Sequence, residues 1–165
     1  MRQDPKTKGT NPKSIVGSNK LPLHLWPSTA TAVGCLGFLD GMLKYGYANY
    51  RVSGVRASVY IAAALRHILA YLEGEECASD SKVPHLGHAL ACLAILVDAK
   101  AAGVLNDDRP YPGGYNKLVE ELLLVVEYLK KSHADKNPRH YTIKDNLNES
   151  ETRRPRLDRG RKLDR

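Results

Sequence analysis

Apolar residues recur three or four positions apart over four long segments of the chain, and stretches rich in glycine, proline and polar residues separate these segments. This period is typical of amphipathic α-helices. No stretch shows the apolar–polar alternation of a half-buried strand, and no internal repeat is visible. We therefore predict an all-α fold of about four main helices, over residues Ala30–Tyr45, Val55–Leu72, His85–Ala102 and Tyr115–Ser132.

Residues with strong end preferences set the bounds of these helices. Ser28 or Thr29 is a candidate N-cap of the first helix, because a side-chain oxygen there accepts a hydrogen bond from a backbone N–H. Pro84 suits the first turn of the third helix. Gly74 and Gly103 follow the second and third helices, where glycine commonly ends a helix.

Three segments outside the helices have features of their own. Leu23 to Trp26 lies between two prolines, and we predict an extended apolar patch that packs against the core. Gly46 to Arg51 is a predicted loop that is dense in aromatic residues. Asn106 to Gly114 contains two prolines and two glycines and is a second predicted loop.

The third predicted helix is apolar nearly all round, which is typical of a helix at the centre of a core or of an interface. About ten residues join it to the second helix, and so short a loop favours antiparallel neighbours. Four helices of this length cannot cover the third one fully. We therefore expect a homo-oligomer, either a homodimer or a homotetramer.

Length and composition fit one globular domain with polar ends. The chain has 165 residues, of which 42% are hydrophobic and 26% charged. We predict a polar N-terminal loop segment over residues 1–20, an all-α domain over 21–134 and a mobile basic tail over 135–165. The longest apolar run, Ala89–Val97, is far shorter than the roughly twenty residues of a membrane span.

The expected location is the cytoplasm. The first twenty residues are polar and do not resemble a signal peptide. Three widely spaced cysteines indicate neither a disulfide framework nor a zinc finger.

The net charge of +7 belongs to the two ends of the chain. Residues 1–20 carry a net charge of +4, residues 21–134 carry −1 and residues 135–165 carry +4. A basic folded surface would indicate nucleic acid as a partner. Because the predicted domain is nearly neutral, we expect no nucleic acid as its partner, and binding of nucleic acid through the basic tail is a weaker alternative. The short apolar runs lead us to expect no membrane as a partner either.

Titratable residues concentrate between Arg66 and His88. His85 and His88 are three positions apart, so they share one face of the first turn of the third helix. If the second and third helices are antiparallel, these imidazoles meet the acids at the end of the second helix, with His67 about two turns away. An oxygen-rich site with few imidazoles suits Mg²⁺ or Mn²⁺, which bridge carboxylates to substrate phosphates. The acids are Glu73, Glu75, Glu76 and Asp80.

Several of these residues also have a purely structural interpretation. A Glu-Gly-Glu-Glu run at a helix end is commonly a solvated terminus, and a lone histidine such as His67 is commonly a hydrogen-bonded core residue. Asp98 lies on the apolar third helix and needs a partner, for which Lys100 and Arg66 are the candidates.

The segment around Lys44 is open to two interpretations as well. Asp40 and Lys44 are four positions apart and form either a surface ion pair or part of the same site. Residues 44–51 place cations among aromatic rings, which suits the phosphates and base of a nucleotide and suits a packed protein loop equally well. No glycine-rich phosphate loop, nucleophile elbow, zinc-protease motif or Rossmann fingerprint is present.

A set of segments together resembles the phage dATP/dGTP diphosphohydrolases, the MazZ-type enzymes. Their order and spacing are more specific than any single segment, and they cover roughly residues 11–110. They are Asn11-Pro12-Lys13, Gly17 to Leu23, Lys44-Tyr45-Gly46 with Asn49-Tyr50-Arg51, Ala64 to His67, Gly74-Glu75 and Pro84 to Ala89.

This family is similar to the MazG-like all-α nucleotide pyrophosphohydrolases, which are oligomeric and use Mg²⁺ or Mn²⁺. The resemblance implies a MazG-like catalytic domain that splits a purine deoxynucleoside triphosphate, dGTP or dATP, into the monophosphate and pyrophosphate. In a phage that replaces adenine with 2-aminoadenine, such an enzyme supplies dGMP in the host cytoplasm. The rival prediction is a catalytically inactive helical phage protein that senses nucleotides or binds a host enzyme.

Under this resemblance the candidate site residues fall into three groups. The predicted metal ligands are Asp40, Glu75, Asp80, His85 and His88. The predicted catalytic residues are His67, Glu76 and Asp98. The predicted substrate-binding residues are Trp26, Asn11 and Lys13 at the base, Lys44, Arg51 and Arg66 at the phosphates, and Asn49.

A few positions depart from the family pattern. Asp40 stands where Glu is usual, Ala78 where Asp is common and Lys82 where Gly is common. His85 and His88 stand about where the second acidic pair of the MazG-like pattern would come.

Overall fold

The computed structural model describes residues 13, 17 and 19–145, which belong to two compact units. The first unit ends at Arg109 and the second begins at Pro110. Asn11, most of the predicted N-terminal segment and the tail from residue 146 on lie outside the described residues. The predicted domain over 21–134 spans the division between the units and stays a prediction.

The four long helices are confirmed, with ends within two residues of the predicted ones. Two predicted end signals are wrong. Ser28 already lies inside the first helix, Pro27 is its N-cap, and no side chain caps that end. Pro84 is the N-cap of the third predicted helix rather than a residue of its first turn. The helices are α2 (Ser28–Tyr45), α4 (Ala57–Leu72), α5 (His85–Ala101) and α6 (Tyr115–Ser132).

Three short elements replace parts that the sequence predicts as loop or helix. Helix α3 (Asn49–Ser53) lies in and after the predicted aromatic loop, and Gly54 with φ of +77° ends it. Strand β1 (Val55–Arg56) pairs in parallel with β2 (Leu105–Asn106). A two-residue strand has no alternation to detect, so the periodicity extended the neighbouring helix across it.

The predicted extended apolar patch is wrong. Residues Leu23–Leu25 form a 3₁₀ turn, η1, closed by a backbone hydrogen bond from Leu25 N–H to the Pro22 carbonyl. The side chains do not pack against the core: Leu23 is 73% exposed and Trp26 is 60% exposed. The Trp26 Nε1–H donates to Thr31 Oγ1 at 2.9 Å, which holds the ring beside the start of α2.

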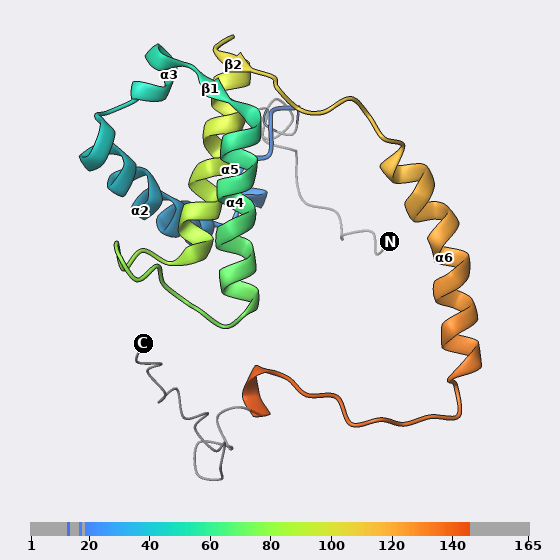
Figure 1. Cartoon of the computed structure of the whole chain (residues 1–165). Coiled ribbons are helices and arrows are strands. Elements are labelled where there is room, and N and C mark those ends of the chain that lie inside the picture. The colour runs from blue at the N-terminus through green and yellow to red at the C-terminus, as the bar shows by residue number, and fades with distance from the viewer. Residues whose placement is uncertain (1–12, 14–16, 18, 146–165) are drawn as a thin grey trace, which may run out of the picture. The chain divides into compact units, whose positions relative to one another are not determined.

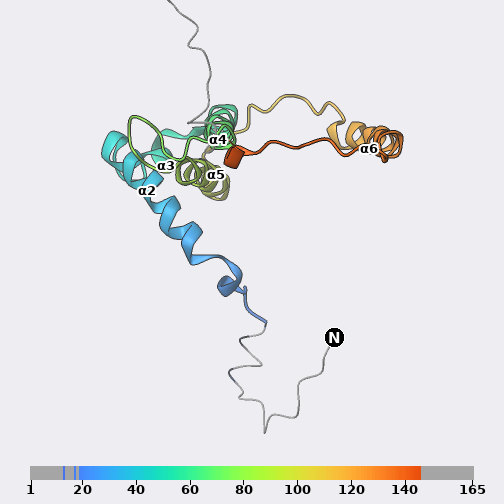
Figure 2. The same ribbon diagram turned by 90° about the horizontal axis from the view of Figure 1, so that it is seen from below.

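Helix α5 is the centre of the first unit, as its apolar circumference predicted. It packs against α4, which runs antiparallel to it, and against α2, which crosses both (Figures 1 and 2). The contacts are close because the facing residues are small. A Cβ added at Gly37 would lie 2.7 Å from the Gly87 carbonyl oxygen, and one at Gly87 would lie 2.7 Å from the Val33 carbonyl oxygen. The backbones of α2 and α5 therefore touch where glycines meet.

The end of the first unit is tied to the start of α4. Asp108 accepts hydrogen bonds from the backbone N–H of Ser58 at 2.8 Å and from Ser58 Oγ at 2.6 Å. These bonds, together with Arg56, lower the pKa of Asp108 to about 2. Asp108, which is fifty residues away in the chain, thus caps the start of α4, where the N-cap residue Arg56 makes no side-chain capping bond.

Helix α6 belongs to the second unit and has no buried residue. Its apolar face includes Leu118, Leu122 and Val125, which are about half exposed. Among the residues that the structure describes, no helix is both long and apolar enough to cross a membrane.

Candidate functional site

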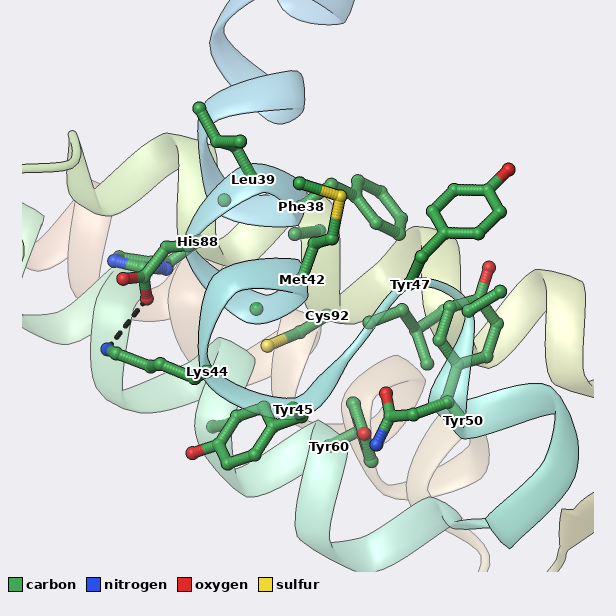
Figure 3. A pocket seen from close by; sticks show the side chains of 18 of the residues that line it. Phe38, Leu39, Met42, Lys44, Tyr45, Tyr47, Tyr50, Tyr60, His88 and Cys92 are labelled. Carbon is green, nitrogen blue, oxygen red and sulfur yellow. Dashed lines mark hydrogen bonds and ion pairs between the residues drawn. The ribbon is translucent and has the colours of Figure 1, made fainter.

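The first unit contains a cavity of about 740 Å³ lined by residues of α2, α3, α4 and α5, of the loop between α2 and α3 and of the loop between α4 and α5. This volume is in the usual range for small-molecule sites. In Figure 3, Lys44 and His88 lie at one end of the view, and Tyr47 and Tyr50 lie at the other. The aromatic rings that line the cavity come from Phe38, Tyr45, Tyr47, Tyr50 and Tyr60.

Two carboxylates surround a lysine at the polar end of the cavity. Lys44 Nζ lies 2.8 Å from Asp40 Oδ2, one helical turn away on α2, and 3.8 Å from Asp80 Oδ2, in the loop between α4 and α5. The hydrogen bond with Asp40 raises the pKa of Lys44. Spacing predicted the Asp40–Lys44 pair, and the structure places it in the cavity wall rather than on a remote surface.

The imidazoles of His67, His85 and His88 meet where α4 packs on the start of α5. His67 Nδ1 lies 2.9 Å from His85 Nδ1, and the His67 ring stacks on the His88 ring with 4.6 Å between centroids. His88 Nε2 also lies 2.9 Å from Ser81 Oγ. Burial lowers the pKa of His67, and nearby imidazoles lower it further. Burial likewise lowers the pKa of His88, although Asp40 opposes the shift.

His67 and His88 line the cavity, whereas His85 and Glu75 are not among the described residues that do. The His85 side chain is 7% exposed, and its Nε2 atom lies 3.5 Å from Glu75 Oε2. That nitrogen is buried and has no hydrogen-bond partner in the described part of the chain. The predicted cluster therefore divides into a cavity side and a buried side.

Arg51 and Asp98 form a bidentate ion pair, with both N–O distances at 2.7 Å. The expectation that Lys100 or Arg66 neutralises Asp98 is therefore wrong, because α3 brings Arg51 to this carboxylate. The pair lowers the pKa of Asp98 and raises that of Arg51. Arg51 lines the cavity, so Asp98 holds a cation in its wall.

The other predicted site residues lie in different places. Asn49 lines the cavity. Trp26, Arg66 and Lys13 are not among the described residues that line it. Glu76 accepts a hydrogen bond through its backbone carbonyl from His85 N–H, and its catalytic role stays a prediction.

Sequence reasoning missed part of the lining on α2, α4 and α5. Tyr60 and Cys92 lie on helices whose residues were interpreted as core, and burial raises the pKa of both. Phe38 and Met42 face the cavity from α2. The signal in the sequence is the run of tyrosines from Tyr45 to Tyr60, which extends beyond the predicted loop that ends at Arg51.

The predicted metal ligands are not gathered around one point. In the described part of the chain, no three His, Cys, Asp or Glu side chains are arranged to hold a metal ion. Lys44 lies between Asp40 and Asp80, and His85 faces Glu75. What the cavity offers is a pair of carboxylates around one cation, two imidazoles, a second cation and an aromatic wall.

This combination suits a ligand that joins a flat ring to an anionic group, since rings stack on aromatic side chains and cations pair with phosphates. No curated protein and no solved structure matches the chain. A family model described as the N-terminal part of the dATP/dGTP diphosphohydrolases matches residues 10–109, which is more than half of the chain and ends where the first unit ends. The chain therefore belongs to the dATP/dGTP diphosphohydrolase family and is an enzyme that hydrolyses nucleoside triphosphates.

Proposed function

We propose that the enzyme hydrolyses purine deoxynucleoside triphosphates to the monophosphate and pyrophosphate, with dGTP as the main substrate and dATP as a second candidate. In a phage that builds 2-aminoadenine into its DNA, the reaction would supply dGMP in the host cytoplasm. The observation that carries this proposal is the cavity, in which an aromatic wall leads to Lys44, Asp40 and Asp80.

The aromatic wall would bind the purine base. Tyr47 and Tyr50 lie away from the charged end in Figure 3, so a stacked base leaves the triphosphate directed at Lys44. Arg51 adds a second cation, which Asp98 fixes in place. Because the negative charge on the phosphates grows or shifts during hydrolysis, prepositioned cations lower the barrier more than mobile ones do.

Mg²⁺ or Mn²⁺ would be held by Asp40 and Asp80, with His88 beside them. Their carboxylate oxygens already converge on a cation, the Lys44 ammonium, and such oxygens are the ligands that Mg²⁺ prefers. When bound, the ion neutralises phosphate charge. His67, which lines the same cavity, would accept a proton from the attacking water.

We also propose that the enzyme acts as a homodimer or homotetramer. Large apolar side chains on all three long helices of the first unit are exposed although the helices pack together. Such residues favour burial against a second copy. Examples are Leu43 on α2, Leu72 on α4 and Val97 on α5, each more than 70% exposed.

The test is to incubate the purified chain with dGTP and Mg²⁺ or Mn²⁺ and to identify the products. We expect dGMP and pyrophosphate in equal amounts, with no release of free phosphate. Phosphate alone would indicate a different phosphohydrolase. No turnover with any deoxynucleoside triphosphate would instead favour the inactive nucleotide-sensing or host-binding protein.

A further inference from the structure

The hydrogen bond between His67 and His85 couples the tautomers of the two rings, because one ring must donate and the other must accept. Their Nδ1 atoms are 2.9 Å apart, which is a hydrogen-bond distance. A neutral imidazole carries hydrogen on one nitrogen only, so one of these atoms donates and the other accepts. The direction of this bond decides which nitrogen of His67 is bare.

The other nitrogen of His85 settles the direction. If His85 donated through Nδ1, its Nε2 would be bare and buried, and it would face the Glu75 carboxylate at 3.5 Å. The buried nitrogen would then face another acceptor and have no donor, which is costly. If His85 carries its hydrogen on Nε2, that N–H points to Glu75. The Glu75 side chain is 52% exposed and has room to close the remaining distance.

In this arrangement His85 accepts from His67, so the hydrogen of His67 is on Nδ1 and its Nε2 is bare. His67 lines the cavity, and its ring is held flat against His88. Since Nδ1 is engaged by His85, Nε2 is the nitrogen that remains for a ligand or a water molecule in the cavity.

We propose that Glu75 and His85 are positioning residues that hold His67 in the Nδ1–H form, so that its Nε2 takes a proton from the water that attacks the nucleotide. This inference rests on the proposed function. The water oxygen bonds to phosphorus, the bond from that phosphorus to the leaving oxygen breaks, and its electron pair departs with the leaving phosphate group. The proton stays on His67 Nε2 until solvent removes it. Glu75, through His85, stabilises the resulting imidazolium.

This role differs from the role of metal ligand that the sequence suggested for Glu75 and His85. A metal ligand must donate an electron pair to the ion, whereas a positioning carboxylate only needs to accept a hydrogen bond. Glu75→Gln keeps an oxygen acceptor but loses the charge, and Glu75→Leu loses both. The two variants therefore separate the two roles.

The direct test is nitrogen-15 NMR of the histidine side chains in the full chain without nucleotide, at a pH where the imidazoles are neutral. We expect hydrogen on Nδ1 of His67 and on Nε2 of His85. Hydrogen on Nε2 of His67 would overturn the inference whether or not the protein hydrolyses dGTP. If these forms are found but no deoxynucleoside triphosphate is hydrolysed, the positioning role fails with the proposed function.

Kinetics on variants give the second test. His85→Leu removes the acceptor, and we expect kcat for dGTP to fall about tenfold to a hundredfold with KM nearly unchanged. His85→Asn keeps an oxygen for His67 Nδ1–H and should retain most of kcat. Glu75→Gln should keep the Mg²⁺ dependence of the wild type, whereas Glu75→Leu should lower kcat. A large rise in the Mg²⁺ requirement of Glu75→Gln would show a metal ligand and contradict the inference.

Discussion

His85 and His88 lie on the same face of the same turn of α5, yet they belong to different environments. His88 lies at the cavity, where Asp40 and Asp80 also lie. His85 is buried behind it, with Glu75 as the nearest charged group. Sequence spacing gives a shared helix face, but packing against α2 and α4 decides which residue meets a ligand. If this is so, changes on the cavity side should affect hydrolysis more than changes elsewhere.

The largest expected effect comes from Asp40→Asn. Loss of this carboxylate from the cavity should lower kcat for dGTP about a thousandfold, because it removes a charged ligand of the proposed ion. Steady-state kinetics over a range of Mg²⁺ concentrations measure the effect. Glu121→Gln is the matched control, because Glu121 is also paired with a lysine four positions away, on α6. If Asp40→Asn keeps more than about a tenth of wild-type kcat, the cavity side is not the catalytic one.

Gly87→Ala should disturb the close packing of α5 against α2. Gly87 lies between His85 on the buried side and His88 on the cavity side. A Cβ at this position would lie 2.7 Å from a carbonyl oxygen of α2, and backbone cannot yield as a side chain does. We expect the free energy of unfolding to fall by about 3 kcal/mol in urea titrations. Gly41→Ala has open space around the new methyl group and should raise stability by about 1 kcal/mol through helix propensity. Equal effects of the two changes would contradict the close contact.

Asp98→Asn should affect substrate binding more than the chemical step. The carboxylate holds Arg51 by two hydrogen bonds in the cavity wall, so its loss leaves the cation mobile. We expect KM for dGTP to rise about tenfold and kcat to change less. Asp107→Asn is the control, since Asp107 also pairs with an arginine, Arg109, but this arginine, unlike Arg51, does not line the cavity. A fall in kcat with unchanged KM would point to a direct catalytic role for Asp98.

The smallest effect is expected from Lys82→Gly in the loop that carries Asp80. Lys82 has φ of +59°, a conformation that costs an L side chain roughly 1 kcal/mol and costs glycine almost nothing. This strain gives a physical reason to expect that glycine suits position 82 better than lysine does. The variant should gain up to about 1 kcal/mol in thermal unfolding, whereas Lys100→Gly, inside α5, should lose about as much. If both variants lose stability, the backbone at position 82 is not strained.

Periodicity was enough to predict the long helices, because each has many apolar positions on one face. It could not predict the pairing of Val55 with Leu105, because the two residues are fifty positions apart in the chain and each strand has only two residues. The Asp40–Lys44 pair was visible because both residues are on one helix. The partner of Asp98 was not, since Arg51 reaches it only through the folding of α3. Tyr60 was not predicted as a cavity residue, because it lies among apolar residues of α4 and only the packing of the helices shows which of them face the cavity.

The most direct measurement is a crystal structure of the protein with Mn²⁺ and a deoxyguanosine triphosphate analogue that resists hydrolysis. The account predicts the guanine among the tyrosines of the cavity, the triphosphate beside Lys44 and Arg51, and the ion on Asp40 and Asp80. An ion bound by Glu75 and His85, with the nucleotide outside the cavity, would contradict it.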